Sequence, residues 1–174
     1  MNNLYGGIKM NNLYDEMLRQ SLKTPAFRNL LFFCSNMAPC TIIYKNITFP
    51  SSENLYQSFK TSDINQAILF SKMTPAESKQ AGKKIEERFE LPCGFKTNRL
   101  KIMQKVLKLK FEQNKDLRDL LIISNDIELV ERNNWNDTFW GFSKGNGENH
   151  LGRLLMEERQ YYLNLLKEPI NLSI

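Results

Sequence analysis

The stretch Phe49-Pro50-Ser51-Ser52-Glu53-Asn54-Leu55-Tyr56-Gln57 decides how this chain folds, because a strand pattern ends in it and a helix pattern begins. Before it, residues 41–44 and 47–49 are rich in β-branched and aromatic side chains and flank the polar pair Lys45-Asn46, which predicts a β-hairpin. After Pro50 the apolar side chains recur at helical spacing, so a helix is predicted from Ser51 onward.

The predicted helix presents a carboxylate in its first turn. If Ser51 is the N-cap, Glu53 is at position N2, and it shares one stripe of the helix with Gln57 and Lys60. The partial positive charge of a helix start favours an ionised carboxylate. Such a group is either a simple helix-start acid, or a carboxylate that stabilises an oxocarbenium-like transition state at a ribose or activates the attacking water.

A second block, Trp135-Asn136-Asp137-Thr138-Phe139-Trp140-Gly141, again combines an acid with aromatic and amide side chains. Asp137 is either a turn residue or a functional carboxylate, and Trp140 either packs in the core or stacks on a flat base. The glycine-rich residues 141–147 lead into a helix start, where backbone N–H groups can bind phosphate. They match neither the P-loop nor the dinucleotide fingerprint. The single histidine, His150, is interpreted as a surface residue.

Periodicity and capping signals predict the other elements. Thr74, Pro75 and Glu77 occupy the N-cap, N1 and N3 positions of a capping box, which starts a helix. Apolar spacing predicts a short helix around residues 13–18, an extended segment at 30–33, helices at 98–113, 116–123 and 149–167, and a strand at 127–131.

The composition bounds the class of protein. A chain of 174 residues suffices for one domain with a core. No apolar run approaches the roughly 20 residues of a membrane span, and the first residues lack the pattern of a secretory signal. Cys34, Cys40 and Cys93 have no metal spacing and indicate free thiols in a reducing compartment. A cytoplasmic protein is therefore expected, in the host cytoplasm if a phage encodes it, with no metal and no redox cofactor.

The chain is basic, with a formal net charge of +5. This charge fits a phosphate-bearing ligand or a nucleic acid, and equally an ordinary basic protein. Lys101, Lys105 and Lys108 share one face of the helix predicted at 98–113. That stripe is either a solvated face or a contact with nucleic acid.

An ordered set of short motifs over about residues 30–165 resembles the YbiA-like family, also called NADAR. No single motif is specific, but their order along the chain is. The matching residues are Phe33-Cys34-Ser35-Asn36 with Ala38-Pro39, Phe49 to Gln57 with Phe59-Lys60, Thr74 to Lys79 with Gly82, Met103, Leu107, Lys110-Phe111, Leu117-Arg118 to Leu121, Leu129 to Glu131, Asp137, Trp140-Gly141, Gly147, Asn149, Leu151-Gly152 and Leu154-Leu155-Met156.

The resemblance implies an N-glycosidase. Members of the family resemble enzymes that cleave phosphorylated riboflavin-pathway intermediates, or hydrolases that remove ADP-ribose from guanine in nucleic acid. The family pattern places the catalytic carboxylates at Glu53 and Asp137 and an aromatic wall at Phe95. Together with the local chemistry it suggests these substrate-binding residues: Ser35, Asn36, Gln57, Lys60, Phe95, Trp140, Gly141 and Asn149.

We therefore expect an α+β fold, a predominantly α-helical single domain with a small β-hairpin, formed by residues 25–174 after an N-terminal arm of residues 1–24. The expected reaction is hydrolysis of an N-glycosidic bond in a ribosyl or ADP-ribosyl substrate. The expected partner is a small-molecule N-riboside or ADP-ribosylated nucleic acid, and no membrane. Because Phe142 and Glu148 depart from the family pattern, the alternative is a non-catalytic module that binds ADP-ribose or a related nucleotide. Sequence patterns predict neither the native substrate nor the oligomeric state.

Overall fold

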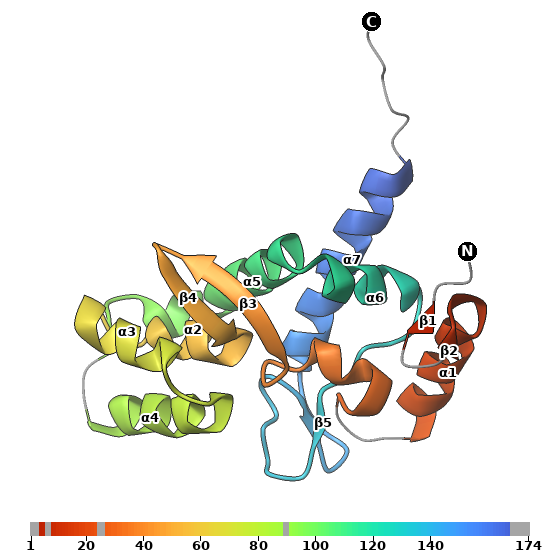
Figure 1. Ribbon diagram of the computed structural model, residues 1–174. Helices are drawn as coiled ribbons and strands as arrows, with labels where there is room; N and C mark the ends of the chain where they lie inside the picture. The colour runs from red at the N-terminus through yellow and green to blue at the C-terminus, as the bar shows by residue number, and fades with distance from the viewer. Residues whose placement is uncertain (1–3, 6–7, 24–26, 89–90, 168–174) are drawn as a thin grey trace, which may run out of the picture. The chain divides into compact units, whose positions relative to one another are not determined.

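The computed structural model describes residues 4–5, 8–23, 27–88 and 91–167 (Figure 1). The chain forms two compact units, which we call the hairpin unit, Phe32–Arg118, and the terminal unit, Met1–Leu31 with Asp119–Ile174. Helices dominate the described residues, and the longest strands form one two-stranded antiparallel sheet. The predicted α+β class with mostly helical structure is confirmed.

The predicted hairpin is present in the hairpin unit. Strands β3 (Pro39–Tyr44) and β4 (Ile47–Ser51) pair antiparallel, with Ile42 opposite Phe49, and both of these side chains are buried. The turn residues Lys45 and Asn46 both have positive φ, 49° and 61°. Two consecutive residues of positive φ form the type I′ turn, whose twist matches that of a two-residue hairpin.

Two amide side chains bond the edge of β3 that does not pair with β4. They come from the end of α5 (Phe95–Gln113) and from Asn114, which follows it. Gln113 accepts from the Ile43 N–H at 2.7 Å and donates to the Ile43 carbonyl at 3.1 Å. Asn114 does the same for Thr41, at 3.1 and 2.9 Å. These amides satisfy backbone groups that a free sheet edge would expose.

Helix α2 (Ser52–Ser58) is the centre of the hairpin unit. It contacts both strands and the helices α3 (Ile64–Ser71), α4 (Pro75–Arg88) and α5, as Figure 1 illustrates, and all its residues are buried. Asn54 ties it to the end of α3, because its amide donates to the carbonyls of Phe70 and Met73 at 2.7 and 2.8 Å. A helix with no solvent-facing side has polar groups only where they find internal partners.

The predicted capping box starts α4. The Glu77 carboxylate accepts from the Thr74 N–H and hydroxyl, each at 2.8 Å, and the Glu77 N–H donates to the Thr74 hydroxyl at 3.3 Å. The hydrogen bond from the Thr74 backbone N–H has the larger effect, followed by the bond from the Thr74 hydroxyl, and both hold the pKa of Glu77 below its usual value. The helix start that the sequence predicts is thus confirmed.

The terminal unit combines α1 (Met10–Lys23), the end of α6 (Lys115–Ile123), the parallel pair β5 (Arg132–Asn133) and β6 (Phe142–Ser143), and α7 (His150–Lys167). The short strands β1 (Leu4–Tyr5) and β2 (Ile8–Lys9) precede α1. The buried Arg159 of α7 donates to the Ser124 hydroxyl and to the Ile127 carbonyl, both at 2.9 Å.

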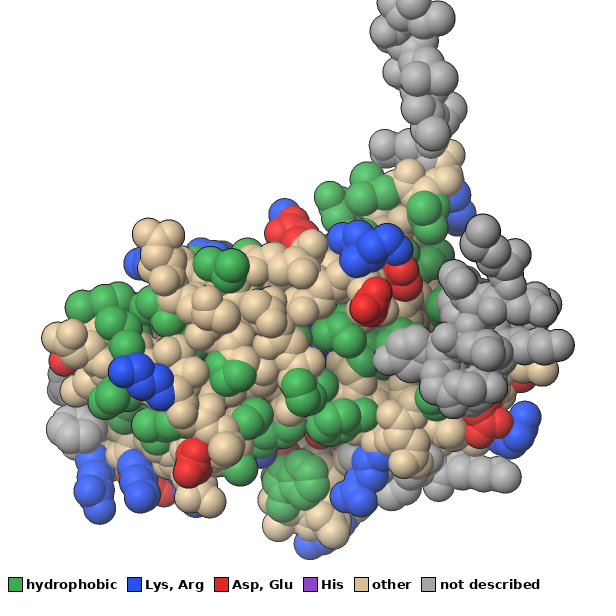
Figure 2. All heavy atoms as spheres, viewed as in Figure 1, with side chains coloured by type: hydrophobic (Ala, Val, Ile, Leu, Met, Phe, Trp, Pro, Cys, Tyr) green, Lys and Arg blue, Asp and Glu red, His purple; other side chains and the backbone are tan. Residues whose placement is uncertain are grey.

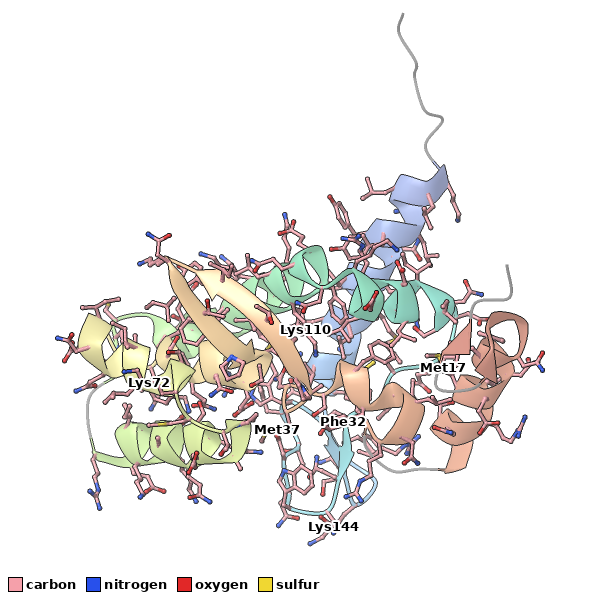
Figure 3. The ribbon with its side chains drawn as sticks, viewed as in Figure 1. Met17, Phe32, Met37, Lys72, Lys110 and Lys144 are labelled. Carbon is pink, nitrogen blue, oxygen red and sulfur yellow. The ribbon has the colours of Figure 1, made fainter. Side chains whose placement is uncertain are left out.

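Helix α1 confirms the short helix predicted near the N-terminus. Met17, labelled in Figure 3, and Leu13 are fully buried, as expected for its apolar face. The predicted boundary at residue 24 lies outside the described residues, so the division into an arm and a domain stays a prediction.

Two predicted extended segments are wrong. Residues 30–33 belong to a 3₁₀ helix, Asn29–Cys34, because a continuous apolar run fits a tight helix as well as a buried strand. Residues 127–131 form no strand, and β5 begins only at Arg132. There Ile127 and Leu129 are buried while Glu128 is exposed, so the alternation is real although no partner strand pairs with the segment.

One helix and the start of another differ from the prediction. The prediction missed α3, and α5 begins at Phe95 rather than at residue 98. Gly94 precedes α5 with a positive φ of 78° and no side-chain cap. Glycine adopts this conformation without steric cost, but it offers none of the side-chain capping signals from which a helix start is normally predicted.

Candidate functional site

The Glu53 carboxylate lies in the first turn of α2, at the position the sequence predicts. Ser51 is the N-cap, and its hydroxyl accepts from the Asn54 N–H at 3.2 Å, so Glu53 is residue N2. Glu53 is only 6% exposed. The Gln57 amide, one turn further along α2, donates to the Glu53 Oε1 at 2.7 Å. A buried carboxylate is therefore held in a fixed direction by a neutral donor.

The loop after the 3₁₀ helix holds the backbone of the same residue. The Glu53 N–H donates to the Asn36 carbonyl at 3.0 Å, and the Ser52 hydroxyl approaches the same oxygen at 3.4 Å. The Asn36 side-chain amide points to the Met103 sulfur at 3.5 Å, and its Oδ1 is buried with no hydrogen-bond partner in the described part of the chain. Ser35 accepts from the Met37 N–H at 3.1 Å and thereby fixes the loop's turn.

Lys60 follows α2 and is 7% exposed. Its ammonium pairs with the Glu86 carboxylate at 2.8 Å and approaches the Gly82 carbonyl at 3.4 Å, both on α4. It also lies 6.0 Å from the centre of the Phe95 ring. Phe95 is itself buried and packs against Tyr56 with 5.8 Å between ring centres. The predicted ligand residues Lys60 and Phe95 thus lie together, next to Glu86.

Gly82 explains how the Gln57 side chain fits between α2 and α4. A Cβ at this position would overlap the Gln57 side-chain oxygen. That oxygen is buried and has no hydrogen-bond partner among the described residues, while the nitrogen of the same amide bonds Glu53. The absence of a side chain at Gly82 is therefore what allows Gln57 to lie along α4 and reach Glu53.

A hollow of about 440 Å³ adjoins this group of residues within the hairpin unit. It is lined by Glu86 and by residues 91–97, so Phe95 forms part of its wall and Lys96 contributes a cation. A space of this size falls in the range of small-molecule sites.

The Asp137 carboxylate, in the terminal unit, caps a turn. Its Oδ1 accepts from the Trp140 N–H at 2.9 Å. The Asn133 side chain accepts from the Asp137 N–H at 3.1 Å and donates to the Asp137 carbonyl at 2.8 Å. Asn136 has a positive φ of 64°, as in a tight turn. The turn that the local sequence suggests for Asp137 is present, and it uses one of the two carboxylate oxygens.

Two other predicted residues of the terminal unit, Asn149 and Gly141, contact backbone groups of the segment before β5. The Asn149 amide accepts from the Glu131 N–H at 3.0 Å and donates to the Leu129 carbonyl at 2.9 Å. A Cβ on Gly141 would overlap the Glu131 carbonyl. Trp140 is half-buried and meets the Phe139 ring edge-on at 4.9 Å. Asn149 and Gly141 thus hold the segment before β5 in place.

The predicted site residues divide between the two units. Ser35, Asn36, Glu53, Gln57, Lys60 and Phe95 belong to the hairpin unit, whereas Asp137, Trp140, Gly141 and Asn149 belong to the terminal unit. Within the hairpin unit, hydrogen bonds and ring contacts connect Asn36 to Glu53, Glu53 to Gln57, and Lys60 to Phe95.

Sequence reasoning missed Glu86 and Tyr56 as members of this group. Tyr56 belongs to the apolar spacing that predicts α2, and nothing in that spacing indicates that it packs on Phe95. Glu86 could have been found, because it lies one turn beyond Gly82, on the face of α4 whose small residues Ser78 and Gly82 are buried. A residue at i+4 on a face that packs closely against α2 is a natural partner for a cation there.

Comparison with known proteins gives a consistent result. Residues 19–162 match the model of the NADAR domain. N-glycosidase YbiA of Escherichia coli is 33% identical over 136 residues, which cover 72% of this chain and 78% of that protein. A riboflavin biosynthesis protein of Vibrio vulnificus is 32% identical over 131 residues, and the match covers 74% of this chain but only 35% of that longer protein. The NMR structure of E. coli YbiA aligns with a TM-score of 0.72 and 29% identity, over 86% of this chain and 89% of that one.

The chain belongs to the NADAR family. The resemblance stated from the ordered motifs is therefore confirmed, and so is the expected enzyme class at the level of the family, whose curated relatives include N-glycosidases from E. coli and Nostoc punctiforme. None of the helices in the described ranges has the length and apolar character that crossing a bilayer requires.

Proposed function

We propose that this protein hydrolyses the N-glycosidic bond of a ribosyl or ADP-ribosyl substrate and that Glu53 carries the reaction. The observation that supports this proposal most directly is the buried Glu53 carboxylate, oriented by Gln57 at 2.7 Å and placed at the start of a helix. Its relatives named N-glycosidases give the reaction type.

The chemistry needs a carboxylate of this kind. As the bond between the ribose C1′ and the nitrogen lengthens, positive charge develops on the sugar ring. A carboxylate fixed beside the ring stabilises that charge, or removes a proton from the water that attacks C1′. The Gln57 amide can donate but leaves the charge of Glu53 intact, so it orients the carboxylate without neutralising it.

The charge distribution supports a substrate that carries phosphate. The hairpin unit has fifteen Lys and Arg against eight Asp and Glu, whereas the rest of the chain has nine against eleven. Lysines of α4 contribute to this excess, and blue side chains project along that helix in Figure 2. An excess of basic side chains on the unit that contains Glu53 raises the local concentration of an anionic substrate. Such substrates include an ADP-ribosyl-guanosine, free or in nucleic acid, and a phosphorylated ribosylamino-pyrimidine.

We expect the other predicted site residues to contact the ligand. In the hairpin unit, Asn36 and Gln57 hold polar groups of the ligand and Phe95 forms an apolar wall. For the terminal unit the predicted roles are an apolar wall for Trp140 and, for Asp137, orientation of ribose hydroxyls or a share of the acid–base work. The Oδ1 of Asn36, which has no hydrogen-bond partner among the described residues, supports its role, because a buried acceptor gains from a ligand hydroxyl or amino group. For Asp137 the second carboxylate oxygen is the one assigned to this work, since the first bonds Trp140.

The test is direct measurement of product. Purified protein is incubated with ADP-ribosylated guanosine and, separately, with a ribosylamino-pyrimidine phosphate, and released base, amine or ADP-ribose is separated by chromatography. We expect release with one of these substrates, and we expect Glu53→Ala to abolish it while calorimetry still detects binding of ADP-ribose. Tight binding by the wild type without turnover of either N-riboside would instead identify a binding module. Affinity for unmodified oligonucleotides with a steep salt dependence would identify a nucleic-acid-binding protein.

A further inference from the structure

A buried lysine that the proposed reaction does not use lies close to the Asn36 loop. Lys110, on α5, is 0% exposed and is labelled in Figure 3 with Phe32 and Met37 of the neighbouring segment. Its ammonium donates to the Phe33 carbonyl at 2.6 Å and to the Ser35 carbonyl at 2.9 Å. Within the residues that the structure describes, no carboxylate lies at ion-pair distance from it.

Burying an ammonium without a counter-charge is unfavourable, and carbonyl dipoles offset only part of that cost. Burial lowers the pKa of Lys110, and the thiols of Cys40 and Cys34 oppose the shift. A hydrophobic side chain of similar length would fill the same space without this cost. What distinguishes the lysine from an apolar residue at this position is its ability to donate hydrogen bonds to the Phe33 and Ser35 carbonyls.

The contacts of Lys110 lead directly to Glu53. The Ser35 carbonyl that it holds is followed at once by Asn36, whose own carbonyl accepts from the Glu53 N–H at 3.0 Å. The Ser52 hydroxyl approaches that same Asn36 carbonyl at 3.4 Å. The acceptor of the Lys110 ammonium and the acceptor of the Glu53 amide are thus the carbonyls of two consecutive residues.

Lys110 is also distinct from the other polar residues at the end of α5. Gln113 and Asn114 bond the backbone of Ile43 and Thr41, on the edge of β3. Of these three residues, only Lys110 bonds the loop that meets α2. Its two acceptors, at Phe33 and Ser35, hold this loop on both sides of Cys34.

We propose that Lys110 is a positioning residue for Glu53: its ammonium fixes the carbonyls of Phe33 and Ser35, and the loop so fixed presents the Asn36 carbonyl that anchors the first turn of α2. This inference rests on the proposed function only in the claim that Glu53 acts in catalysis. The contact chain itself, from Lys110 through Ser35 and Asn36 to the Glu53 amide, does not depend on it.

Substitution of Lys110 by methionine removes the donors and keeps most of the volume. The Phe33 carbonyl then loses its partner, the loop shifts toward other donors, and the Asn36 carbonyl moves away from the Glu53 N–H. Because displacement of a catalytic group by about 1 Å costs about a hundredfold in rate, we expect kcat to fall at least about tenfold with KM within about a factor of two. The matched control is Gln113→Ala, which removes a neighbouring backbone contact of α5 that does not touch the loop.

Amide hydrogen exchange by NMR gives a readout that simple loss of packing would not produce. In Lys110→Met we expect the Glu53 amide to exchange much faster, while the amides of Ile42 in β3 and Val106 in α5 exchange as in the wild type. In Gln113→Ala the Glu53 amide should keep its wild-type rate. Faster exchange of all three amides in Lys110→Met would show a merely structural role and overturn the proposal, and so would unchanged exchange and unchanged kcat.

Lys110→Gln covers the case in which the methionine variant does not fold. Its amide carries N–H donors on a shorter arm that reaches at most one of the two carbonyls, so kcat and Glu53 exchange should lie between those of wild type and the expected methionine variant. Wild-type values for both would contradict the inference. Failure of the proposed function would appear separately, as unchanged turnover in Glu53→Ala, and would leave the exchange result for Lys110 intact.

Discussion

The surroundings of Glu53 and of Asp137 use the same residue types for opposite purposes. Around Glu53, an amide holds the carboxylate: the Gln57 side chain donates to it, while the Asn36 carbonyl fixes the backbone N–H of the same residue. Around Asp137, side chains hold backbone: the Asp137 carboxylate caps Trp140, and Asn149 bridges Leu129 and Glu131. An acid held on a buried helix is preorganised for chemistry, whereas an acid in a turn also stabilises its loop.

The two carboxylates can be compared directly by removing their charge and keeping their shape. Glu53→Gln should lower kcat by about 10²- to 10⁴-fold, the usual contribution of a carboxylate in acid–base work. Asp137→Asn keeps an oxygen for the Trp140 N–H, so the turn should persist, and kcat should fall by at least about 10²-fold if the charge shares the acid–base work. Product release under saturating substrate measures both.

The outcome for Asp137 decides between its two roles. Wild-type kcat in Asp137→Asn, together with a lower melting temperature in Asp137→Ala, would assign this carboxylate to the turn alone. Equal losses of kcat in Glu53→Gln and Asp137→Asn would instead show that the two carboxylates contribute equally to the reaction.

The glycines of the two regions offer the next largest contrast. In Gly82→Ala the new methyl group meets the flexible end of the Gln57 side chain, which must leave Glu53, so kcat should fall about tenfold while stability changes little. In Gly141→Ala it meets the Glu131 carbonyl, which is backbone, so the free energy of unfolding should fall by about 1–3 kcal/mol or more. Denaturant unfolding and turnover on the same preparations test both. Unchanged turnover in Gly82→Ala would mean that Gln57 does not set the Glu53 position.

Two asparagines that bond backbone groups, the buried Asn54 and the half-buried Asn149, provide a comparison of stability alone. Asn54 donates to the carbonyls of Phe70 and Met73, and Asn149 bridges Leu129 and Glu131. Each alanine variant leaves backbone groups unpaired, so each should lower the free energy of unfolding by about 2 kcal/mol. Urea unfolding measures this. A loss of affinity for ADP-ribose in Asn149→Ala without a loss of stability would support its predicted role in substrate binding.

The smallest effect concerns two exposed carboxylates with lowered pKa values. The pKa of Glu77 is low because of its own capping box with Thr74, and that of Asp126 is low first because Tyr14 donates to it at 2.5 Å. Tyr14→Phe should raise the pKa of Asp126 toward its ordinary value and leave Glu77 unchanged, as an NMR titration of both carboxyl groups would show. An unchanged Asp126 would mean that its own backbone hydrogen bond suffices.

The sign of the stability change follows from the direction of these shifts. A carboxyl group whose pKa is lower in the folded state contributes stability that is present above its unfolded pKa and is lost as the pH falls through the folded pKa. The contributions of Glu77 and Asp126 should therefore disappear in acid. The stability difference between wild type and Tyr14→Phe should shrink over the same acid range.

The elements that could be predicted share one property: their determinants are close together in sequence. The turn at Lys45-Asn46, the capping box of Thr74 and Glu77, and the N2 position of Glu53 all depend on residues within a few positions of one another. The strand predicted at 127–131 is absent because its determinants are not local. A strand requires a partner strand, and local alternation does not supply one.

The amino-acid sequence by itself determined the hairpin, the starts of α2 and α4, the identity of the candidate carboxylates and, through the order of its motifs, the family. Only the tertiary structure decided what those carboxylates touch. The fit of Gln57 against Gly82, the pairing of Lys60 with Glu86 and the reach of Lys110 to the Asn36 loop all join residues of different elements. Such contacts depend on how helices and strands pack around a shared core, which short-range spacing does not encode.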